Sequence, residues 1–229
     1  MQLRVHIYGL PRSGTNAIAA LIRRNFADRL CHVETPDHLG YVSEWKHGPI
    51  VHERFKPDRR YVIVHKHPLV WLVSFWEFLR SGADWANWNR ADWHADFRVW
   101  ITRPWFGHAT PIDWWIQQHR QWLDYAPSSQ TVWVPHHELV SRPSAVLERL
   151  AAAGLSRTGR QWELLHEYVT VNERPVGDWQ GRSRDYERRF WTRYYTEKTR
   201  RIVLSRCDPV VLERLGYQLR APDYLAAEQ

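Results

Sequence analysis

The sequence is poor in cysteine and has no long apolar run. Its two cysteines, Cys31 and Cys207, lie far apart and form no CxxC pair. This argues against a disulfide framework and against a zinc site, and it fits a reducing compartment. No stretch of about 18 apolar residues is present, and the first residues enter a strand pattern without a basic–apolar signal segment. We therefore expect a soluble, non-exported, cytoplasmic protein without a membrane span.

The chain also lacks internal repeats, low-complexity tracts and Gly/Ser-rich linkers, which predicts a single domain over residues 1–229. Its formal net charge of +7 invites a nucleic-acid interpretation. However, the arginines between 182 and 201 are interspersed with Asp185, Glu187 and Glu197, as on a solvated helix face. A positive field also suits an anionic cofactor, so nucleic acid is the less favoured partner.

An anion-binding loop is predicted near the N-terminus. Apolar residues alternate over 3–8 as in a strand, and a helical apolar spacing begins at Ile18. Between them, Gly9–Asn16 (GLPRSGTN) has the glycine spacing of a Walker A loop, which would aim backbone N–H groups at an anion. Thr15-Asn16 replaces the Lys-Ser/Thr that Mg-ATP requires, and Arg12 is the only cation in the loop. The loop is predicted to bind another phosphate-bearing ligand, with a plain strand-to-helix turn as the alternative.

Strand and helix patterns alternate along the chain. The run 61–64 (YVIV) is typical of a strand buried on both faces of a parallel sheet. Further strands are predicted at 31–34 and 131–134, and helices at 69–79, 143–153, 161–169 and 186–204. This alternation predicts an α/β three-layer fold, with a central parallel sheet flanked by helices and ligands at the carboxyl ends of the strands.

Several segments, in order, resemble the sulfotransferase family, which transfers sulfuryl groups from 3′-phosphoadenosine 5′-phosphosulfate (PAPS). Gly9–Asn16 is similar to the family's 5′-phosphosulfate loop, often P-[KR]-S-G-T. Lys66, Pro68 and Ser74 keep the spacing of its 3′-phosphate element, with Lys in place of Arg. Segments similar to the YEDL-type segment, the late G-D-W motif and the usual end of the family lie at 134–150, 176–179 and 215–217. The resemblance spans nearly the whole chain and implies a P-loop-like sulfotransferase architecture.

The resemblance implies PAPS as the donor, PAP as the product and no metal. Negative charge builds on the bridging and peripheral oxygens during sulfuryl transfer, so cations and N–H groups are needed near the leaving oxygen. Arg12 is the residue expected to stabilise that oxygen. Lys66 and Ser74 are expected to bind one phosphate, although Lys cannot bind it bidentately as Arg would. The cofactor-binding residues expected in the loop are Arg12, Ser13, Gly14, Thr15 and Asn16.

The catalytic base is assigned through a second segment. Residues 45–49 (WKHGP) resemble the family's K-T-H-x-P, whose His takes the acceptor proton. The resemblance implies His47 as the base, with Lys46 beside it as a further catalytic residue and Glu44 as the alternative base. An imidazole pKa of about 6.5 suits proton abstraction at neutral pH. With 13 histidines in the chain, a structural role for His47 stays open.

The other histidines near these motifs are expected to be structural, and the family's adenine-stacking tryptophan is missing from this chain. His65 and His67 alternate at a strand end and should point to opposite faces, which argues against a metal site there. His136-His137-Glu138 stands where the family has Y-E-D, and a structural role is the preferred interpretation. The family's loop commonly continues T-T-W, with the Trp stacked on adenine, whereas this chain has Asn16-Ala17. Another aromatic residue must replace that platform, or the nucleotide site is altered.

Ten of the 15 tryptophans fall between Trp71 and Trp122. The segment 80–112 has no clean period and is predicted to be an irregular insertion or lid, a kind of segment that often carries function. Core packing is the preferred role for Trp71, Trp76, Trp115 and Trp122. Contact with a small-molecule or glycan acceptor and core packing are both open for Trp85, Trp88, Trp93 and Trp105.

Two other functions stay open at this point. A nucleotide kinase would need a Walker Lys and a carboxylate for Mg²⁺ at a strand end, yet strand 61–64 is followed by His-Lys-His. A basic, Trp-rich protein that binds carbohydrate or single-stranded nucleic acid would fit the composition. It would not account for the ordered phosphate motifs.

Overall fold

The computed structural model describes residues 2–31, 46–48, 50, 57–81, 96–105, 107–169, 175–178 and 189–219. The chain divides into two compact units. The first unit comprises 1–65 and 121–188, and the second comprises 66–120 and 189–229. Each unit is described by itself below, and a single domain over 1–229 stays a prediction.

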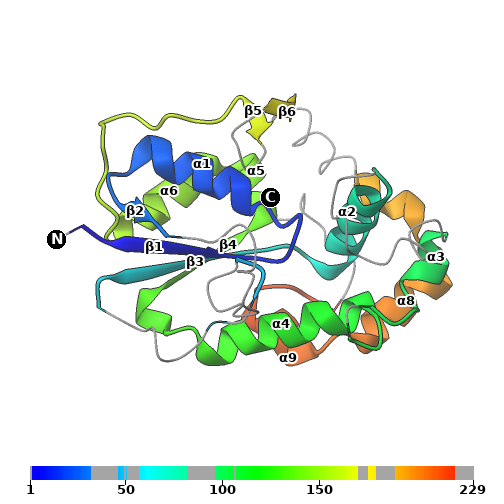
Figure 1. Cartoon of the computed structure of the whole chain (residues 1–229). Coiled ribbons are helices and arrows are strands. Elements are labelled where there is room, and N and C mark those ends of the chain that lie inside the picture. Colours follow the sequence, from blue (N-terminus) through cyan, green and yellow to red (C-terminus); the bar gives the residue numbers. More distant parts are fainter. Residues whose placement is uncertain are drawn as a thin grey trace. The chain divides into compact units, whose positions relative to one another are not determined.

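The first unit is built on a four-stranded parallel sheet (Figure 1). Its strands are β1 (Arg4–Tyr8), β2 (Arg29–Leu30), β3 (Arg59–His65) and β4 (Thr131–Pro135), in the order β2-β1-β3-β4. The chain therefore places β2 on one side of β1 and β3 on the other. The carboxyl ends of β1 and β3 form a topological switch point, which is where open α/β sheets bind ligands.

Burial of the strands follows their place in the sheet. Tyr61–Val64 of the central strand β3 are all buried, as predicted. In β4, Val132 and Val134 are buried, but Trp133 between them is half-buried. The predicted strand at 131–134 is confirmed as β4, which is only partly buried because it is the last strand in the sheet order. The predicted strand 31–34 begins earlier, as β2, and residues 32–34 lie outside the described residues.

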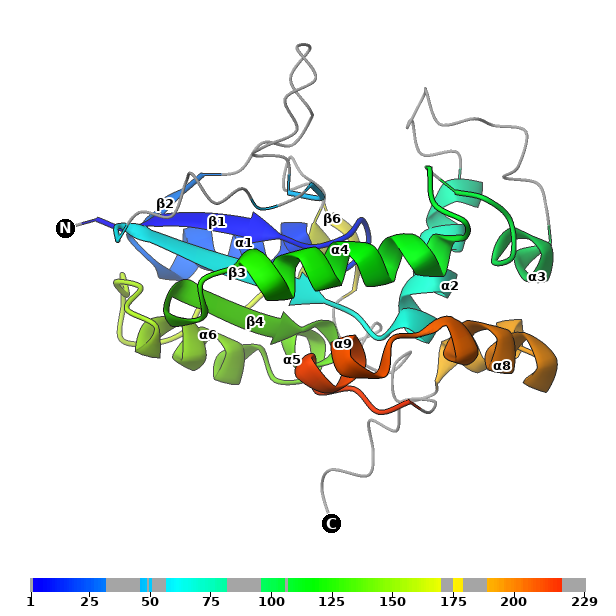
Figure 2. The ribbon, with the colours of Figure 1, turned by 90° about the horizontal axis from the view of Figure 1, so that it is seen from below.

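Helices cover both faces of this sheet. On one face, α1 (Thr15–Asn25) lies beside α6 (Pro143–Ala152), with the short α5 (His136–Ser141) before it (Figures 1 and 2). On the other face, Trp122 packs at 6.4 Å against Tyr8 of β1. Trp122 belongs to α4 (Pro111–Tyr125), and the boundary between the units falls within this helix. A short 3-10 helix, η3 (Ser128–Gln130), leads into β4. The predicted α/β fold, a parallel sheet flanked by helices, is confirmed.

The predicted helix at 161–169 was wrong. Glu163 is held in non-helical conformation by Asn25 of α1, whose side chain accepts from its N–H at 2.7 Å and donates to its carbonyl at 2.9 Å. The chain then forms β5 (Glu167–Val169), which pairs antiparallel with β6 (Pro175–Asp178). Tertiary hydrogen bonds to Asn25 thus replace the local bonds that a helix would have made.

The second unit is mainly helical and rich in aromatic contacts. Its elements are α2 (Pro68–Arg80), α3 (Phe97–Trp100), the first part of α4, η4 (Phe190–Tyr194), α8 (Glu197–Arg206) and α9 (Pro209–Arg214). In α2, Trp71 stacks on Phe75 with ring centroids 5.1 Å apart. Trp114 meets Trp71 edge-on at 5.7 Å, and Trp105 meets Phe75 edge-on at 5.7 Å. The expected core roles of Trp71, Trp76, Trp115 and Trp122 agree with their burial.

The predicted helix at 186–204 was only partly right. Residues 186–188 lie outside the described residues, and Arg189 has a left-handed backbone with φ of 51° before η4. The α-helix α8 begins after Thr196, whose hydroxyl accepts from the N–H of Thr199 in a capping box. Tyr195 precedes that cap, and its hydroxyl donates to the carbonyl of Leu69 at 2.8 Å. The cap and this tertiary bond set the start of the helix.

Candidate active site

The loop Gly9–Asn16 joins β1 to α1, as the sequence predicts. The N–H of Ser13 donates to the carbonyl of Leu10 at 3.0 Å, and the Ser13 hydroxyl donates to the same oxygen. Arg12 is exposed and has φ of 69°, a left-handed conformation that is uncommon outside glycine. Ser13 therefore shapes the loop with both of its donors, while the Arg12 side chain is exposed to solvent.

The N-terminus of α1 points unpaired backbone donors out of the loop. The first bond along the helix runs from the N–H of Ile18 to the carbonyl of Gly14, at 3.1 Å. The N–H groups of Thr15, Asn16 and Ala17 precede that bond, and none of them has an acceptor among the described residues. No side chain caps Gly14, and no acidic residue lies in the first turn. Together with the helix dipole, these donors favour an anion at this end.

Two glycines in the loop have no room for a side chain. A Cβ at Gly9 would lie 2.6 Å from the carbonyl oxygen of Val64 and 2.6 Å from Ser13 Oγ. A Cβ at Gly14, where φ is 101°, would lie 2.8 Å from Cδ2 of His136. His136 begins α5 and is 4% exposed. His136 therefore packs against the loop. In the sequence, its position just after the predicted strand 131–134 was the only indication that it would lie near the loop.

The segment 46–48 is hydrogen-bonded to the loop. The N–H of Gly9 donates to the carbonyl of Lys46 at 2.9 Å, and Lys46 Nζ donates to Asn16 Oδ1 at 2.8 Å. The carbonyl of Gly48 accepts from the indole N–H of Trp122 at 2.9 Å. Lys46 is 5% exposed, so its ammonium group is held beside the helix N-terminus rather than in solvent.

His47 has a defined tautomer because of this arrangement. Its Nδ1 is hydrogen-bonded to the carbonyl oxygen of Gly9. A carbonyl can only accept, so Nδ1 carries the hydrogen, and in the neutral ring Nε2 is the nitrogen with a lone pair. His47 is 5% exposed. The family resemblance implied His47 and Lys46 as catalytic residues, and the structure places both of them against the loop.

The second unit contains the predicted Lys66–Ser74 pair. Lys66 directly follows β3 in the chain and is 5% exposed, and its Nζ lies 3.4 Å from Ser74 Oγ on α2. The N-cap of α2 is His67, whose Nδ1 accepts from the N–H of Leu69 at 3.2 Å. Because Pro68 starts the helix at once, Ser74 lies on its second turn and reaches back to Lys66.

Trp115 supports the backbone of Lys66. Its indole N–H donates to the Lys66 carbonyl at 3.1 Å. His119 stacks on Trp115 with centroids 4.0 Å apart, and its Nδ1–H donates to the carbonyl of Trp115 at 2.7 Å. Burial lowers the pKa of His119 to about 3, against the opposing effect of that hydrogen bond. His119 is thus neutral at physiological pH. Sequence reasoning assigned Trp115 to the core and missed this support.

Several predicted residues have a different status. Glu44, Trp85, Trp88 and Trp93 lie outside the described residues. Trp105 is 8% exposed and packs against Trp100 and Phe75, so its acceptor contact stays a prediction.

Within the described ranges, no group of three His, Cys, Asp or Glu side chains is placed to hold a metal ion. No helix in those ranges is both long and apolar enough to cross a membrane.

Comparison with known proteins gives a fold but no close relative. No family model matches the chain, and no curated protein matches it in sequence. The structure is similar to a crystal structure of mouse sulfotransferase SULT7A1 in complex with PAP, with a TM-score of 0.54 and 13% identity. The match covers 96% of this chain and 90% of that one. The fold is that of a sulfotransferase. At this identity the likeness establishes the architecture and leaves activity and substrate to be argued from the site.

Proposed function

We propose that the protein is a PAPS-dependent sulfotransferase that acts on a hydroxyl group of a small molecule or glycan. The proposal rests on the hydrogen bonds that hold His47, as the base, and Lys46, as a cation, against the loop Gly9–Asn16. His47 is bound to the carbonyl of Gly9, Lys46 is bound to Asn16, and the N–H groups at the start of α1 lie next to them. A phosphate loop alone would need neither a buried lysine nor a tautomer-fixed histidine. The PAP complex of the structural neighbour supports the same conclusion.

Each residue then has a distinct task. The N–H groups of Thr15, Asn16 and Ala17, with the Arg12 side chain, bind the 5′-phosphosulfate and stabilise the leaving oxygen. The acceptor oxygen attacks sulfur as the bond from sulfur to the bridging oxygen breaks, which releases PAP. The acceptor proton passes to Nε2 of His47. In the second unit, Lys66 and Ser74 bind the 3′-phosphate, with Lys66 as a point charge.

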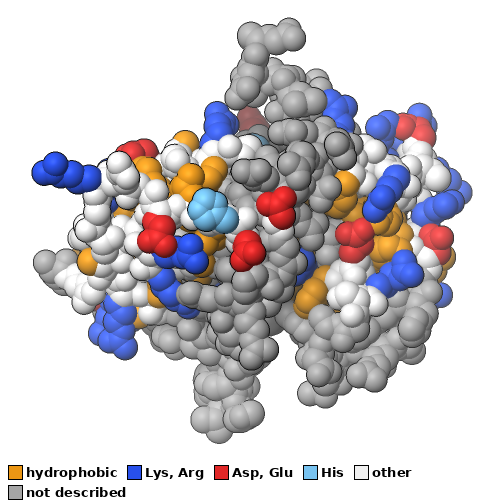
Figure 3. Space-filling model, turned by 90° about the horizontal axis from the view of Figure 1, so that it is seen from above, with side chains coloured by type: hydrophobic (Ala, Val, Ile, Leu, Met, Phe, Trp, Pro, Cys, Tyr) orange, Lys and Arg blue, Asp and Glu red, His pale blue; other side chains and the backbone are white. Residues whose placement is uncertain are grey.

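A kinase function is less well supported. The first turn of α1 carries Thr15-Asn16 where a Walker loop has Lys-Ser/Thr, and Lys46 enters from another segment. A general nucleic-acid function also has less support, because basic and acidic side chains are interspersed over the described part of the face in Figure 3. Several arginines among the described residues are paired with acidic side chains, for example Arg149 with Glu138 at 2.8 Å.

The deciding experiment is calorimetric titration of the whole chain with PAP, with the nucleotide that lacks the 3′-phosphate, and with Mg-ATP. We expect tight binding of PAP alone, because both phosphates must be bound. A preference for Mg-ATP would establish the kinase function instead. Binding of neither, together with salt-dependent binding of oligonucleotides or glycans, would indicate a Trp-rich binding protein.

The Arg12→Ala variant adds a direct test of the loop. We expect turnover to fall by about 10²–10³-fold, as on removal of one oxyanion donor, in an acceptor screen that follows sulfate transfer. Equal activity of Arg12→Ala and the parent would remove Arg12 from the mechanism. Arg103→Ala, on an exposed arginine of the second unit, is the control and should leave turnover unchanged.

A further inference from the structure

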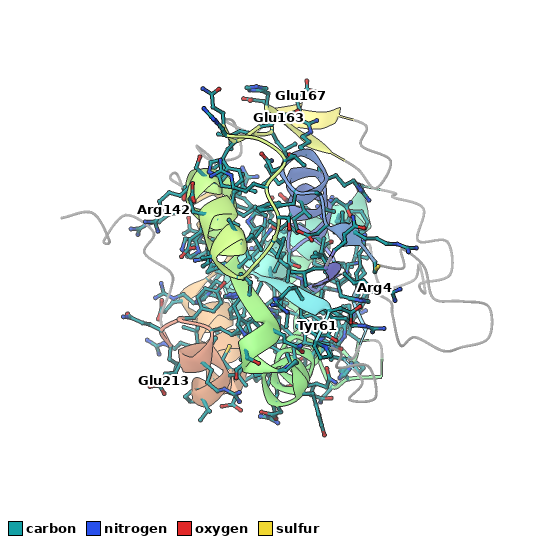
Figure 4. The ribbon with its side chains drawn as sticks, turned by 90° about the vertical axis from the view of Figure 1, so that its left-hand side faces the viewer. Arg4, Tyr61, Arg142, Glu163, Glu167 and Glu213 are labelled. Atoms are coloured by element: carbon teal, nitrogen blue, oxygen red, sulfur yellow. The ribbon has the colours of Figure 1, made fainter. Side chains whose placement is uncertain are left out.

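Three arginines lie side by side where the parallel strands β1, β2 and β3 begin, at the opposite end of these strands from the loop. The register pairs Arg4 of β1 with Arg29 of β2 on one side and with Arg59 of β3 on the other. Paired residues of parallel strands point to the same face, so these three side chains form one row, which we call the arginine row. Figure 4 views this end of the molecule and labels Arg4, with Tyr61 further along the same face. The row lies roughly 16 Å from Gly9, along the length of β1.

The central observation is the state of Arg59. This residue is 8% exposed, and its Nε is buried with no hydrogen-bond partner within the described part of the chain. A buried guanidinium nitrogen without an acceptor is costly, and such groups in native proteins usually bind water or an ion. Arg60, next in sequence, points to the other face, where its Nε donates to the carbonyl of Ala153 at 2.9 Å.

The described carboxylates near the row do not balance its charge. Asp58 lies 3.8 Å from Arg4 and is the only acidic side chain paired with the row in the described residues. Asp28 precedes Arg29, but its two oxygens accept from the N–H groups of Leu3 at 3.0 Å and Ser156 at 2.6 Å. Like charges on adjacent strands destabilise a sheet. In the described residues, this row of three arginines therefore carries more positive charge than its one acidic partner balances, and the buried Nε of Arg59 has no acceptor.

We infer that the arginine row binds a tetrahedral dianion, inorganic phosphate or sulfate. The guanidinium group presents a planar fork that matches two oxygens of such an anion, and adjacent forks can share the remaining oxygens. Arg29 and Arg4 are exposed, so the anion reaches the row from solvent, while Arg59 forms its buried side. The site is independent of the proposed function, because it shares no residue with the loop or with the Lys66–Ser74 pair.

The test is a thermal-unfolding series in phosphate, in sulfate and in chloride at equal ionic strength. We expect the parent Tm to rise by roughly 3–6 °C over chloride when the dianion is about ten times its Kd. The Arg59→Gln variant should show a smaller rise than the parent, because the share that the row contributes is lost. Its Tm in chloride should equal or exceed that of the parent because repulsion is relieved. Arg29→Gln, at an exposed position that folding tolerates, should reduce the rise.

The control variant is Arg24→Gln on α1, whose arginine is paired with Glu163 at 3.6 Å and should retain the full rise. An equal rise in the parent and in both row variants would mean general salt stabilisation or binding at the loop, and would overturn the proposal. No difference between dianion and chloride in the parent would overturn it as well. Because no nucleotide is present, failure here would not bear on the sulfotransferase proposal.

Discussion

The loop of the first unit and the Lys66–Ser74 pair of the second unit, which we propose to bind anions, are built in different ways. The loop uses backbone N–H groups whose direction is fixed by the start of α1 and by glycines without space for a Cβ. The pair uses two side chains whose position depends on packing, through the bond from Trp115 to the Lys66 carbonyl. We expect the loop to be intolerant of changes at its glycines, and the pair to be sensitive to changes in its aromatic support.

The largest effect should come from His47→Asn. The asparagine amide can still donate to the carbonyl of Gly9, but it has no base at the position of Nε2. Turnover should fall by about 10²–10⁴-fold while PAP binds as before, measured by initial rates and calorimetry. His47→Gln loses the bond to Gly9 as well, so it should also weaken PAP binding. An unchanged rate in His47→Asn would move the base to another residue.

Gly14→Ala tests the backbone character of the loop. The new Cβ would meet His136 at 2.8 Å in a backbone with φ of 101°, so the start of α1 must shift. We expect PAP affinity to fall by at least about tenfold and stability by about 1–3 kcal/mol, measured by calorimetry and denaturant unfolding. Gly107→Ala is the matched control, since φ there is 79° and nothing lies within 4 Å. If Gly14→Ala and Gly107→Ala both bind PAP as the parent does, the backbone at Gly14 does not shape the binding site. Equal losses of stability in both variants would assign that loss to the positive φ and not to the contact with His136.

Trp115→Phe tests whether the hydrogen bond from Trp115 positions the Lys66–Ser74 pair. Removing the indole N–H frees the carbonyl of Lys66, and we expect PAP affinity to fall by roughly 3–10-fold, in line with one lost hydrogen bond. Affinity for the nucleotide without the 3′-phosphate should not change. Lys66→Ala should show the same pattern with a larger loss. Equal losses for both nucleotides would show that Trp115 contributes only to stability.

The smallest effect at neutral pH concerns His119. Its pKa is about 3 in the folded chain and about 6.5 when unfolded, so between these values the unfolded state binds one more proton. Stability should therefore fall as pH decreases from 6.5 towards 3. In His119→Phe, which keeps an aromatic ring on Trp115, the slope of unfolding free energy against pH should be smaller by about 1.4 kcal/mol per pH unit. An unchanged slope in urea unfolding at pH 4–6 would contradict the lowered pKa.

Much of the fold and part of the site could be predicted because the signals are local. The apolar run of β3, the helix 68–80 after Pro68 and the glycine loop before α1 are each specified by neighbouring residues. The Lys66–Ser74 contact also follows locally, from one strand-to-helix turn. The assignment of His47 and Lys46 to the loop came from resemblance to a family, since their segment lies 30 residues further along the chain.

The sequence by itself therefore determined the parallel strands β1, β3 and β4, the helices α1, α2 and α6, the position of the glycine loop and the sulfotransferase resemblance. The tertiary structure decided features that depend on distant partners. Asn25 turned the apolar pattern of 161–169 into an extended segment, and the carbonyl of Gly9 selected the tautomer of His47. Strand register aligned Arg4, Arg29 and Arg59, which are separated along the chain. Local propensity cannot encode such pairings, because their energy comes from groups that meet only after folding.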